Sequence, residues 1–274
     1  MSGTAFFKLT GSGNDFIMLD GRTTSPDEWP AGRIVRACDR RHGIGADGLA
    51  ILTPEQGGVR MHFYNLDGGR AAMCGNAALC STRLSARLGM ADPAGMQLVT
   101  DAGTYLTRCV GPGHMAEVNL ADVALPEPVP GIEPGPGELE ITLATVGVPH
   151  LVVRVADIEA VDIQGRGREL RFHPALGAAG ANANFVSAPS SAGAPWLIRT
   201  YERGVEGETL ACGTGTVAAA VSLAAGGHAA MPVGFRSRGG APLSVAAEIA
   251  DGRATGIWLC GEGRLVFTGT LADQ

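Results

Sequence analysis

The apolar residues of this chain occur mainly in short runs, each bounded by glycine, proline, asparagine or aspartate. Such runs, several of which alternate apolar and polar positions, predict β-strands joined by tight turns. The turn Gly11-Ser12-Gly13-Asn14-Asp15 separates the first two strands, which we expect to form a hairpin. The predicted strands cover residues 6–10, 16–20, 49–52, 59–65, 97–100, 103–109, 115–120, 139–146, 151–155, 182–186, 196–204, 243–249, 255–260 and 264–271.

Two longer segments lack this pattern and predict helices that begin beside a cysteine. Each starts with a cysteine, a glycine and a small polar residue, continues without proline, and ends at a glycine 15 positions after the cysteine. The segments run from Cys74 to Gly89 and from Cys212 to Gly227. Alanine and leucine favour a helical interior, and glycine is common just beyond a helix C-terminus. A shorter helix is predicted over residues 31–39.

The duplicated cysteine unit predicts two similar lobes. Five prolines in residues 125–137 exclude that segment from a central strand or a helix, so it is a natural boundary between lobes. We predict an N-terminal lobe over residues 1–122, to which the C-terminal strand 262–274 returns, and a C-terminal lobe over residues 123–261. Because strands and helices do not alternate regularly, the expected fold class is α+β.

The length and charge of the chain limit the kinds of molecule that it is expected to bind. A length of 274 residues suits two domains whose cores need no metal or disulfide. The formal net charge is −6 and lysine and arginine form no dense cluster, which argues against nucleic-acid and membrane binding. No apolar stretch has the length of a membrane span, and the N-terminus lacks the pattern of a signal peptide. We therefore expect a cytoplasmic protein that acts on a small molecule.

The six cysteines fall into two groups. None belongs to a Cys-x-x-Cys pair, so no metal site is predicted, and Cys38, Cys80, Cys109 and Cys260 are interpreted as small buried residues. The other two, at positions 74 and 212, each precede a helix N-terminus. The unsatisfied amides there lower the pKa of a thiol and bind anions such as carboxylates.

Two such thiols, one from each lobe, predict stereochemical inversion. If both face one carbon atom, a thiolate can remove a proton from one side while a thiol delivers a proton to the other. This exchange requires no cofactor, and none is expected.

Six motifs occur in an order that resembles the diaminopimelate epimerase family. No single motif is specific, but the ordered set spans nearly the whole chain and is typical of that superfamily of cofactor-independent epimerases. The motifs are Gly11-Ser12-Gly13-Asn14-Asp15-Phe16, His42-Gly43-Ile44-Gly45-Ala46-Asp47-Gly48, Asn65-Leu66-Asp67-Gly68 with Met73-Cys74-Gly75-Asn76, Gly147-Val148-Pro149-His150, Asn182-Ala183-Asn184-Phe185, and Tyr201-Glu202-Arg203-Gly204 with Ala211-Cys212-Gly213-Thr214-Gly215.

The resemblance implies two pseudo-symmetric lobes, each a curved antiparallel sheet wrapped around a central helix, in a homodimer. It implies an isomerase that interconverts LL- and meso-diaminopimelate for lysine and peptidoglycan precursor synthesis. Cys74 and Cys212 would be the acid–base pair, tuned by His150 and Glu202. Arg203 suits bidentate capture of the distal carboxylate. The implied substrate-binding residues are Asn14, Asn65, Gly75, Asn76, Asn182, Glu202, Arg203, Gly213 and Thr214.

Three residues depart from the family pattern. Ala77 and Leu79 replace a glycine and an arginine of the first cysteine motif and lie within the predicted helix, where they affect packing. Val148 stands where the family has an asparagine that contacts the distal end of diaminopimelate. Valine can form no such hydrogen bond, so the same chemistry on another amino acid is an alternative hypothesis.

Simpler interpretations stay open. His150 is compatible with a buried polar residue at a strand start, and Glu202 with Arg203 is compatible with a solvated ion pair. Asn14 and Asn65 are compatible with ordinary turn residues. For the whole chain, the alternatives are a binding protein that has lost turnover and a redox sensor in which the two motif cysteines form a disulfide.

Overall fold

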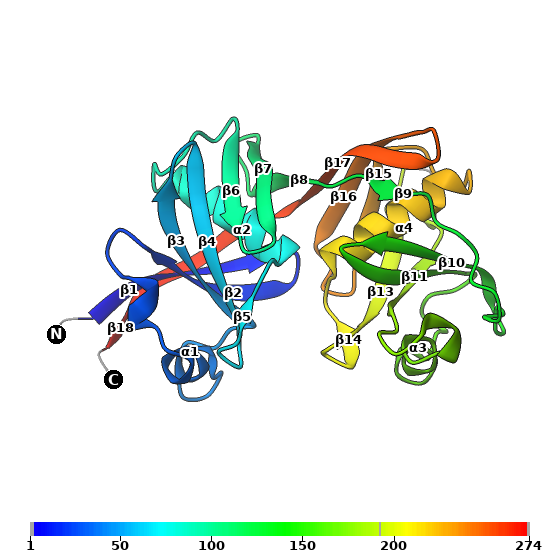
Figure 1. The fold of residues 1–274 in the computed structure, drawn as a ribbon, viewed down its shortest axis with the longest axis horizontal. Coiled ribbons are helices and arrows are strands. Elements are labelled where there is room, and N and C mark those ends of the chain that lie inside the picture. Colours follow the sequence, from blue (N-terminus) through cyan, green and yellow to red (C-terminus); the bar gives the residue numbers. More distant parts are fainter. Residues whose placement is uncertain (1–2, 192, 273–274) are drawn as a thin grey trace. The chain divides into compact units, whose positions relative to one another are not determined.

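The computed structural model describes residues 3–191 and 193–272. Internal contacts divide the chain into two compact units, and most of their helices and strands are labelled in Figure 1. Unit 1 contains the chain up to Asn119 together with the chain from Cys260 onward, and unit 2 contains Leu120–Leu259. The outermost residues of the predicted N-terminal lobe, 1–2 and 273–274, lie outside the described residues.

Unit 1 contains two α-helices, a 3-10 turn at Pro26–Glu28 and nine strands in its described part. The helices are α1 (Ala31–Cys38) and α2 (Gly75–Arg87). The strands are β1 (Gly3–Gly11), β2 (Asn14–Asp20), β3 (Gly48–Glu55), β4 (Gly58–Asn65), β5 (Arg70–Ala71), β6 (Met96–Thr100), β7 (Gly103–Val110), β8 (Met115–Leu120) and β18 (Arg264–Ala272).

Unit 2 has a matching set of elements, with a 3-10 turn at Pro174–Leu176. Its helices are α3 (Ile163–Arg171) and α4 (Gly213–Ala225). Its strands are β9 (Val123–Ala124), β10 (Glu138–Val146), β11 (Val148–Val155), β12 (Asn182–Ser187), β13 (Trp196–Glu202), β14 (Gly207–Thr209), β15 (Val233–Ser237), β16 (Pro242–Ala250) and β17 (Arg253–Glu262).

The two units repeat one order of elements. In unit 1 the hairpin β1–β2 is followed by α1, the hairpin β3–β4, the short β5, and then α2 and β6. In unit 2 the hairpin β10–β11 is followed by α3, the antiparallel pair β12–β13, the short β14, and then α4 and β15. This repeat confirms the predicted α+β fold of two pseudo-symmetric lobes.

The sheets are mixed, whereas the sequence predicted antiparallel sheets. β2 pairs with β3, and β4 with β6, in parallel; in unit 2 the pairs β11–β12 and β13–β15 are also parallel. One α-helix lies in the chain between the two strands of each parallel pair, because parallel neighbours need a long crossover connection. The sequence did not predict these four crossovers, because its many short strands lack a regular alternation with helices.

In the sheet of unit 1, the strand β2 is buried on both faces. Along β2, Phe16 and Met18 belong to the core cluster that includes α2, whereas Ile17 and Leu19 belong to the cluster that includes α1. Successive strand residues point to opposite faces, so both faces of this strand are covered. That is why β2 reads as a continuous apolar run in the sequence.

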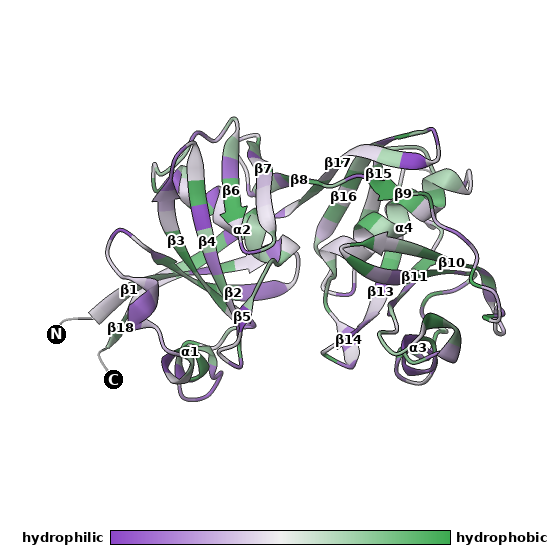
Figure 2. Ribbon diagram, viewed as in Figure 1, coloured by the Kyte–Doolittle hydropathy of each residue, from purple (hydrophilic) through white to green (hydrophobic). Residues whose placement is uncertain are grey.

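The helix α4 is the centre of unit 2. It contacts β10, β11, β12, β15 and β16, and its residues 217–221 are fully buried. A helix that is apolar on all sides needs such an enclosure, and Figure 2 shows α4 in white to green. In unit 1, α2 likewise contacts strands on several sides, including β1, β4 and β7. None of the helices in the described part of the chain has both the length and the apolar character needed to cross a lipid bilayer.

Candidate functional site

Both motif cysteines occupy the N-cap position of a central helix. Cys74 precedes α2 with φ −140° and ψ 120°, and Cys212 precedes α4 with φ −128° and ψ 110°. Both helices have 13 residues. Each chain segment then turns at a glycine in the left-handed region, Gly89 at φ 65° and Gly227 at φ 72°. These equal lengths and ends confirm the duplicated helix unit predicted from the sequence.

The backbone beside each thiol offers hydrogen-bond donors. The first bond inside α2 runs from the Ala78 N–H to the Cys74 carbonyl at 2.9 Å, and the first inside α4 from the Thr216 N–H to the Cys212 carbonyl at 2.9 Å. The three amides before each of these donors have no acceptor within their helix, and they lie at the positive end of its dipole. Cys212 is buried and Cys74 is half-buried. Both settings suit an anion held next to a sulfur atom.

Asn14 connects the start of β2 to the first turn of α2. The Asn76 Nδ2 donates to Asn14 Oδ1 at 2.7 Å, and the Asn14 Nδ2 donates to Asp47 Oδ2 at 2.9 Å. A carboxylate only accepts hydrogen bonds, so Asp47 sets the orientation of the Asn14 amide and, through it, that of Asn76. The predicted residues Asn14, Asn76, Gly75 and Cys74 therefore lie together; we call them cluster 1.

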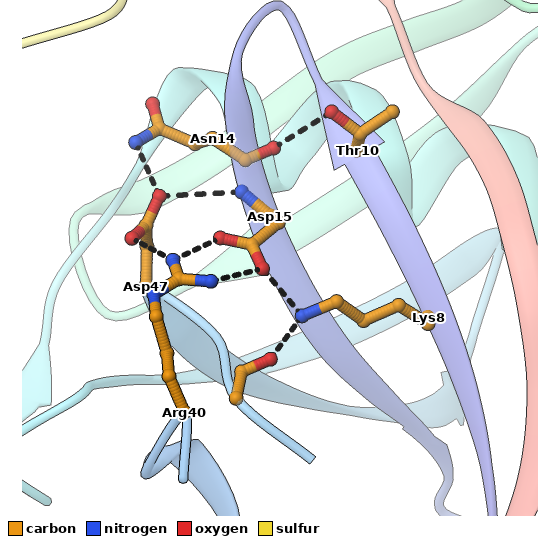
Figure 3. A network of polar contacts seen from close by, with 7 residues as sticks. Lys8, Thr10, Asn14, Asp15, Arg40 and Asp47 are labelled. Carbon is orange, nitrogen blue, oxygen red and sulfur yellow. Dashed lines mark hydrogen bonds and ion pairs between the residues drawn. The ribbon is translucent and has the colours of Figure 1, made fainter.

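Charged residues without a predicted role support this chain of amides (Figure 3). Arg40 donates to Asp15 at 2.6 Å and to Asp47 at 2.8 Å, and Lys8 donates to Asp15 at 2.5 Å and to the Gly45 carbonyl. Burial raises the pKa of Asp15, but the bonds from Arg40 and Lys8 outweigh burial and hold that pKa below its ordinary value. The glycine-rich motif around Gly45 thus forms the outer support of cluster 1.

Asn65 lies at the same end of the sheet as Asn14. It is the last residue of β4, its side chain is exposed, and it pairs with Gly48 at the start of β3. The parallel strands β2 and β3 begin where the antiparallel β4 ends, so residues distant in the sequence meet at one edge.

His150 lies between two asparagines in unit 2. It is fully buried on β11, and its Nδ1 lies 3.4 Å from Asn182 Nδ2 and 3.3 Å from Asn184 Nδ2. β12 runs parallel to β11 with Asn182 opposite His150. Asn184 is part of the motif Asn182-Ala183-Asn184-Phe185, but the sequence predicts no role for it. The available signal was its spacing from Asn182, because alternate strand residues share one face.

Asn184 also lies against the first turn of α4. A Cβ atom on Gly215 would lie 2.2 Å from Asn184 Oδ1 and 3.3 Å from Cys212 Sγ, so only glycine fits there. The Thr214 hydroxyl lies 3.7 Å from the same sulfur. Asn184 therefore links His150 to the helix that begins at Cys212. We call this group, consisting of His150, Asn182, Asn184, Cys212, Gly213 and Thr214, cluster 2.

Burial changes the ionisation of the titratable residues near cluster 2. Burial, assisted by the positive charge of Arg203, lowers the pKa of His150 to about 3, so its imidazole is neutral at neutral pH. Burial also raises the pKa of Glu202, while the nearby Thr209 hydroxyl acts in the opposite direction. The Arg203 backbone N–H donates to Asn182 Oδ1 at 2.7 Å. This bond brings the Glu202–Arg203 end of β13 beside Asn182.

Val148 is the positional counterpart of Asn14. Each is the first residue of the second strand in its hairpin. The following positions correspond as well, since Phe16 pairs with Gly48 in unit 1 where His150 pairs with Asn182 in unit 2. Valine supplies no group that could extend an amide chain like that of cluster 1.

The other polar groups and the cavity considered among the described residues are weaker candidates for a functional site. Burial raises the pKa of the Cys38 thiol to about 11 and that of the Cys80 thiol well above its ordinary value, so both are inert at neutral pH. A cavity of about 470 Å³ in unit 2 is lined by Glu138, Asp162 and Arg166, among others, but Glu138 and Arg166 bond each other at 2.8 Å. Within residues 3–191 and 193–272, no three His, Cys, Asp or Glu side chains are grouped so that they could hold a metal ion.

Comparison with known proteins covers nearly the whole chain. A family model described as diaminopimelate epimerase matches residues 6–125 and 142–256. A diaminopimelate epimerase of Gemmatimonas aurantiaca is 45% identical over 279 residues, which cover 98% of this chain and 99% of the relative. A diaminopimelate epimerase of Aquifex aeolicus is 34% identical over 281 residues, which cover 98% of each chain.

Solved structures share the fold at low sequence identity. A phenazine biosynthesis protein of the PhzF family from Bacillus anthracis matches with a TM-score of 0.75 at 12% identity and covers 100% of both chains. A probable proline racemase from Agrobacterium radiobacter matches with a TM-score of 0.68 at 17% identity, covering 98% of this chain and 93% of that chain.

Proposed function

Because the chain belongs to the diaminopimelate epimerase family and is an amino-acid epimerase, we propose that it interconverts LL- and meso-diaminopimelate by proton exchange between two thiols. One observation carries the proposal: the two units present the same device, a cysteine at the N-cap of a central 13-residue helix. Each device combines a proton-transferring sulfur with backbone donors for a carboxylate.

In the proposed step, the thiolate of one cysteine takes the α-proton and becomes a thiol. The electron pair of the broken C–H bond moves into the α-carboxylate, whose growing charge the helix-terminal amides stabilise. The thiol of the other cysteine gives its proton to the opposite face of the α-carbon and becomes a thiolate. The product has the inverted configuration, and the two sulfurs have exchanged protonation states. The reverse reaction uses the same groups in the opposite order.

The other predicted residues bind the substrate or adjust the two catalytic thiols. Gly75, Asn76, Gly213 and Thr214 supply backbone amides at the two helix N-termini. Asn14, Asn65, Asn182 and Arg203 position the remainder of the substrate, and Arg203 suits a distal carboxylate because its guanidinium binds carboxylates in a bidentate manner. His150 and Glu202 adjust the two thiols.

The biological setting follows from the same proposal. The product meso-diaminopimelate would serve lysine and peptidoglycan precursor synthesis. A cytoplasmic location, expected from the sequence, and a homodimer, implied by the family resemblance, stay predictions. Sedimentation equilibrium of the purified chain tests the dimer.

Exchange in deuterated water tests the reaction. The purified protein is incubated with LL- or meso-diaminopimelate, and deuterium at the α-carbon and the ratio of isomers are followed by NMR and mass spectrometry. Wild type should deuterate both isomers. Cys74→Ser and Cys212→Ser should each lower the epimerisation rate on the order of 10²-fold or more, because each removes one acid–base group.

Cys109→Ser is the matched control, because it makes the same change in β7, outside clusters 1 and 2. It should keep the wild-type rate. Failure of wild type to deuterate either isomer, or undiminished turnover by both single cysteine variants, would refute the two-thiol mechanism. Ligand binding that survives both substitutions without any exchange in wild type would instead indicate a binding protein.

Val148 favours one alternative, in which the same chemistry acts on another amino acid. Its apolar side chain stands at the sheet end where unit 1 has the amide of Asn14. The same exchange assay with a panel of free amino acids separates the two candidates. Deuteration of another amino acid but not of diaminopimelate would establish the alternative.

A further inference from the structure

Two backbone groups fix the amides that surround His150. The Leu151 carbonyl accepts from Asn184 Nδ2 at 2.9 Å, and the Arg203 backbone N–H donates to Asn182 Oδ1 at 2.7 Å. A carbonyl only accepts and an N–H only donates, so neither amide can turn over without losing its bond. Both asparagines therefore present an N–H donor to the His150 Nδ1, at 3.3 and 3.4 Å.

A ring nitrogen that faces two N–H donors must be an acceptor, so Nδ1 carries no proton. The imidazole is neutral, because burial and the charge of Arg203 lower the pKa of His150 to about 3. Its single proton is then on Nε2. The Nε2 atom is fully buried and has no hydrogen-bond partner among the described residues. A buried N–H without an acceptor is costly and indicates a partner that arrives with the ligand.

We propose that Asn182 and Asn184 hold His150 as the neutral Nε2–H tautomer, so that His150 serves the reaction as a hydrogen-bond donor to an anion. The acceptor is a carboxylate or a thiolate, and His150 does not itself remove the α-proton. The catalytic part of this inference rests on the proposed epimerase function. Asn184 is a positioning residue, because it acts through His150.

Asn184 is well suited to this role because it is buried, hydrogen-bonded and closely packed. It is fully buried, and its Oδ1 accepts from the Thr200 hydroxyl at 3.0 Å while its Nδ2 serves Leu151 and His150. Its Oδ1 also lies against Gly215 in the first turn of α4. A satisfied and tightly packed amide holds one geometry, which fixes the tautomer before any substrate binds.

The tautomer is measured by two-dimensional NMR on protein labelled with ¹⁵N-histidine, where the two ring nitrogens give distinct patterns. The resonance of His150 is assigned with His150→Gln. Wild type should show a neutral ring with the proton on Nε2 and no titration between pH 5 and 8. Asn184→Asp places a carboxylate oxygen at Nδ1, which should move the proton to Nδ1 or bring the titration of the ring into that range.

Two further variants show whether a change in the His150 ring comes from the tautomer or from a folding defect. Asn182→Asp keeps the acceptor for the Arg203 N–H and turns its second carboxylate oxygen to Nδ1, so it should have the same effect on the tautomer. Thr200→Val is the matched control: it removes a hydroxyl bonded to Asn184, but the Leu151 carbonyl still fixes the amide, so the Nε2–H tautomer should persist. A wild-type ring protonated on Nδ1, or one that titrates between pH 5 and 8, overturns the inference. So does an unchanged ring in both aspartate variants.

Two more readouts separate this inference from the proposed function. Added diaminopimelate should shift the Nε2–H proton resonance, and Asn184→Asp should lower kcat roughly 10²-fold with a smaller change in KM, as loss of one preorganised donor does. Turnover without any such shift rejects the donor role while the epimerase function stands. An Nε2–H ring in a protein that exchanges no α-proton supports the tautomer and rejects the epimerase function.

Discussion

Asn14 and Asn184 are amides whose orientation is set by partners that only accept hydrogen bonds. Asp47 accepts from Asn14, and the Leu151 carbonyl accepts from Asn184. Each amide in turn orients one further residue through a hydrogen bond: Asn14 orients Asn76 in cluster 1, and Asn184 orients His150 in cluster 2. Substitutions at these supports should therefore change how a site residue is oriented without removing that residue.

The salt bridges of Asp15 predict a particular loss of stability in acid. Its pKa is lower in the folded chain than the unfolded value of about 3.9. A group with a depressed pKa contributes stability that is fully present above the unfolded pKa and is lost as pH falls through the folded pKa. The difference in unfolding free energy between wild type and Asp15→Asn should thus shrink as pH falls from about 5 towards 2.

Urea titrations at several pH values measure this difference. Asp122→Asn is the control, because it removes one carboxylate from an exposed position. A difference between wild type and Asp15→Asn that stays constant over this pH range would show that the bonds to Lys8 and Arg40 contribute nothing to acid sensitivity.

Gly215 predicts a steric defect inside cluster 2. In Gly215→Ala the new methyl group would overlap Asn184 Oδ1 at 2.2 Å, and overpacking of this kind typically costs about 1–3 kcal/mol. Denaturant unfolding measures the loss of stability, and the exchange assay should show a fall in rate. Gly234→Ala in β15 is the matched control, because a Cβ there meets nothing within 4 Å. Equal stability of the two variants would contradict the close approach of α4 to Asn184.

At the scale of elements, α3 shows how packing overrides propensity. Gly165 and Gly167 disfavour a helix, and the local sequence pattern predicts no helix in this segment. The structure explains one of them, because a Cβ on Gly167 would lie 2.7 Å from the Tyr201 Cβ, so glycine lets α3 lie close to β13. Ile163 and Leu170 of α3 enter the same core cluster as Tyr201.

The N-cap of α3 provides a test of this helix. The Asp162 Oδ1 accepts from the Gly165 N–H at 3.0 Å. Asp162→Ala removes this bond and should lower the unfolding free energy by about 1 kcal/mol, whereas Asp162→Asn keeps an acceptor and should cost less. Thermal unfolding followed by circular dichroism compares the two. Identical losses in both variants would mean that the carboxylate charge, and not the capping bond, is what matters.

At the scale of the whole molecule, the first and last strands are neighbours. β1 and β18 pair antiparallel in unit 1, from Gly3 opposite Ala272 to Thr10 opposite Arg264. The rings of Phe6 and Phe267 meet edge to face at 5.9 Å across this pair. The C-terminal strand thus completes the sheet in which the chain begins.

This pairing predicts that the chain tolerates circular permutation. A short flexible linker between the two ends, with new ends opened between Pro112 and Gly113 in the exposed turn after β7, should give a folded protein that keeps exchange activity. Opening the chain between Ile51 and Leu52, which are fully buried in β3, is the control and should prevent folding. Circular dichroism and the exchange assay measure both. If the permutant opened between Pro112 and Gly113 cannot fold, the prediction that the pairing of β1 with β18 permits circular permutation is wrong.

The sequence by itself determined the features that depend on residues close together in the chain. The two cysteine-led helices, their glycine ends and most strands follow from local propensity and turn chemistry, and the ordered motifs identified the family. The sequence also determined that two cysteine thiols lie beside the free backbone amides of helix N-termini.

Only the tertiary structure decided which distant residues meet. The parallel crossovers, the bond of Asn14 to Asp47 and the contact of Asn184 with His150 join residues that lie tens of positions apart. The helix α3 likewise depends on packing, because Gly167, Ile163 and Leu170 lie against the distant Tyr201 or its core cluster. No local pattern encodes such a contact, because it arises when strands from different parts of the chain align in one sheet and bury both of its faces. The protonation of His150 belongs to this second group, since burial and two asparagines from a neighbouring strand set it.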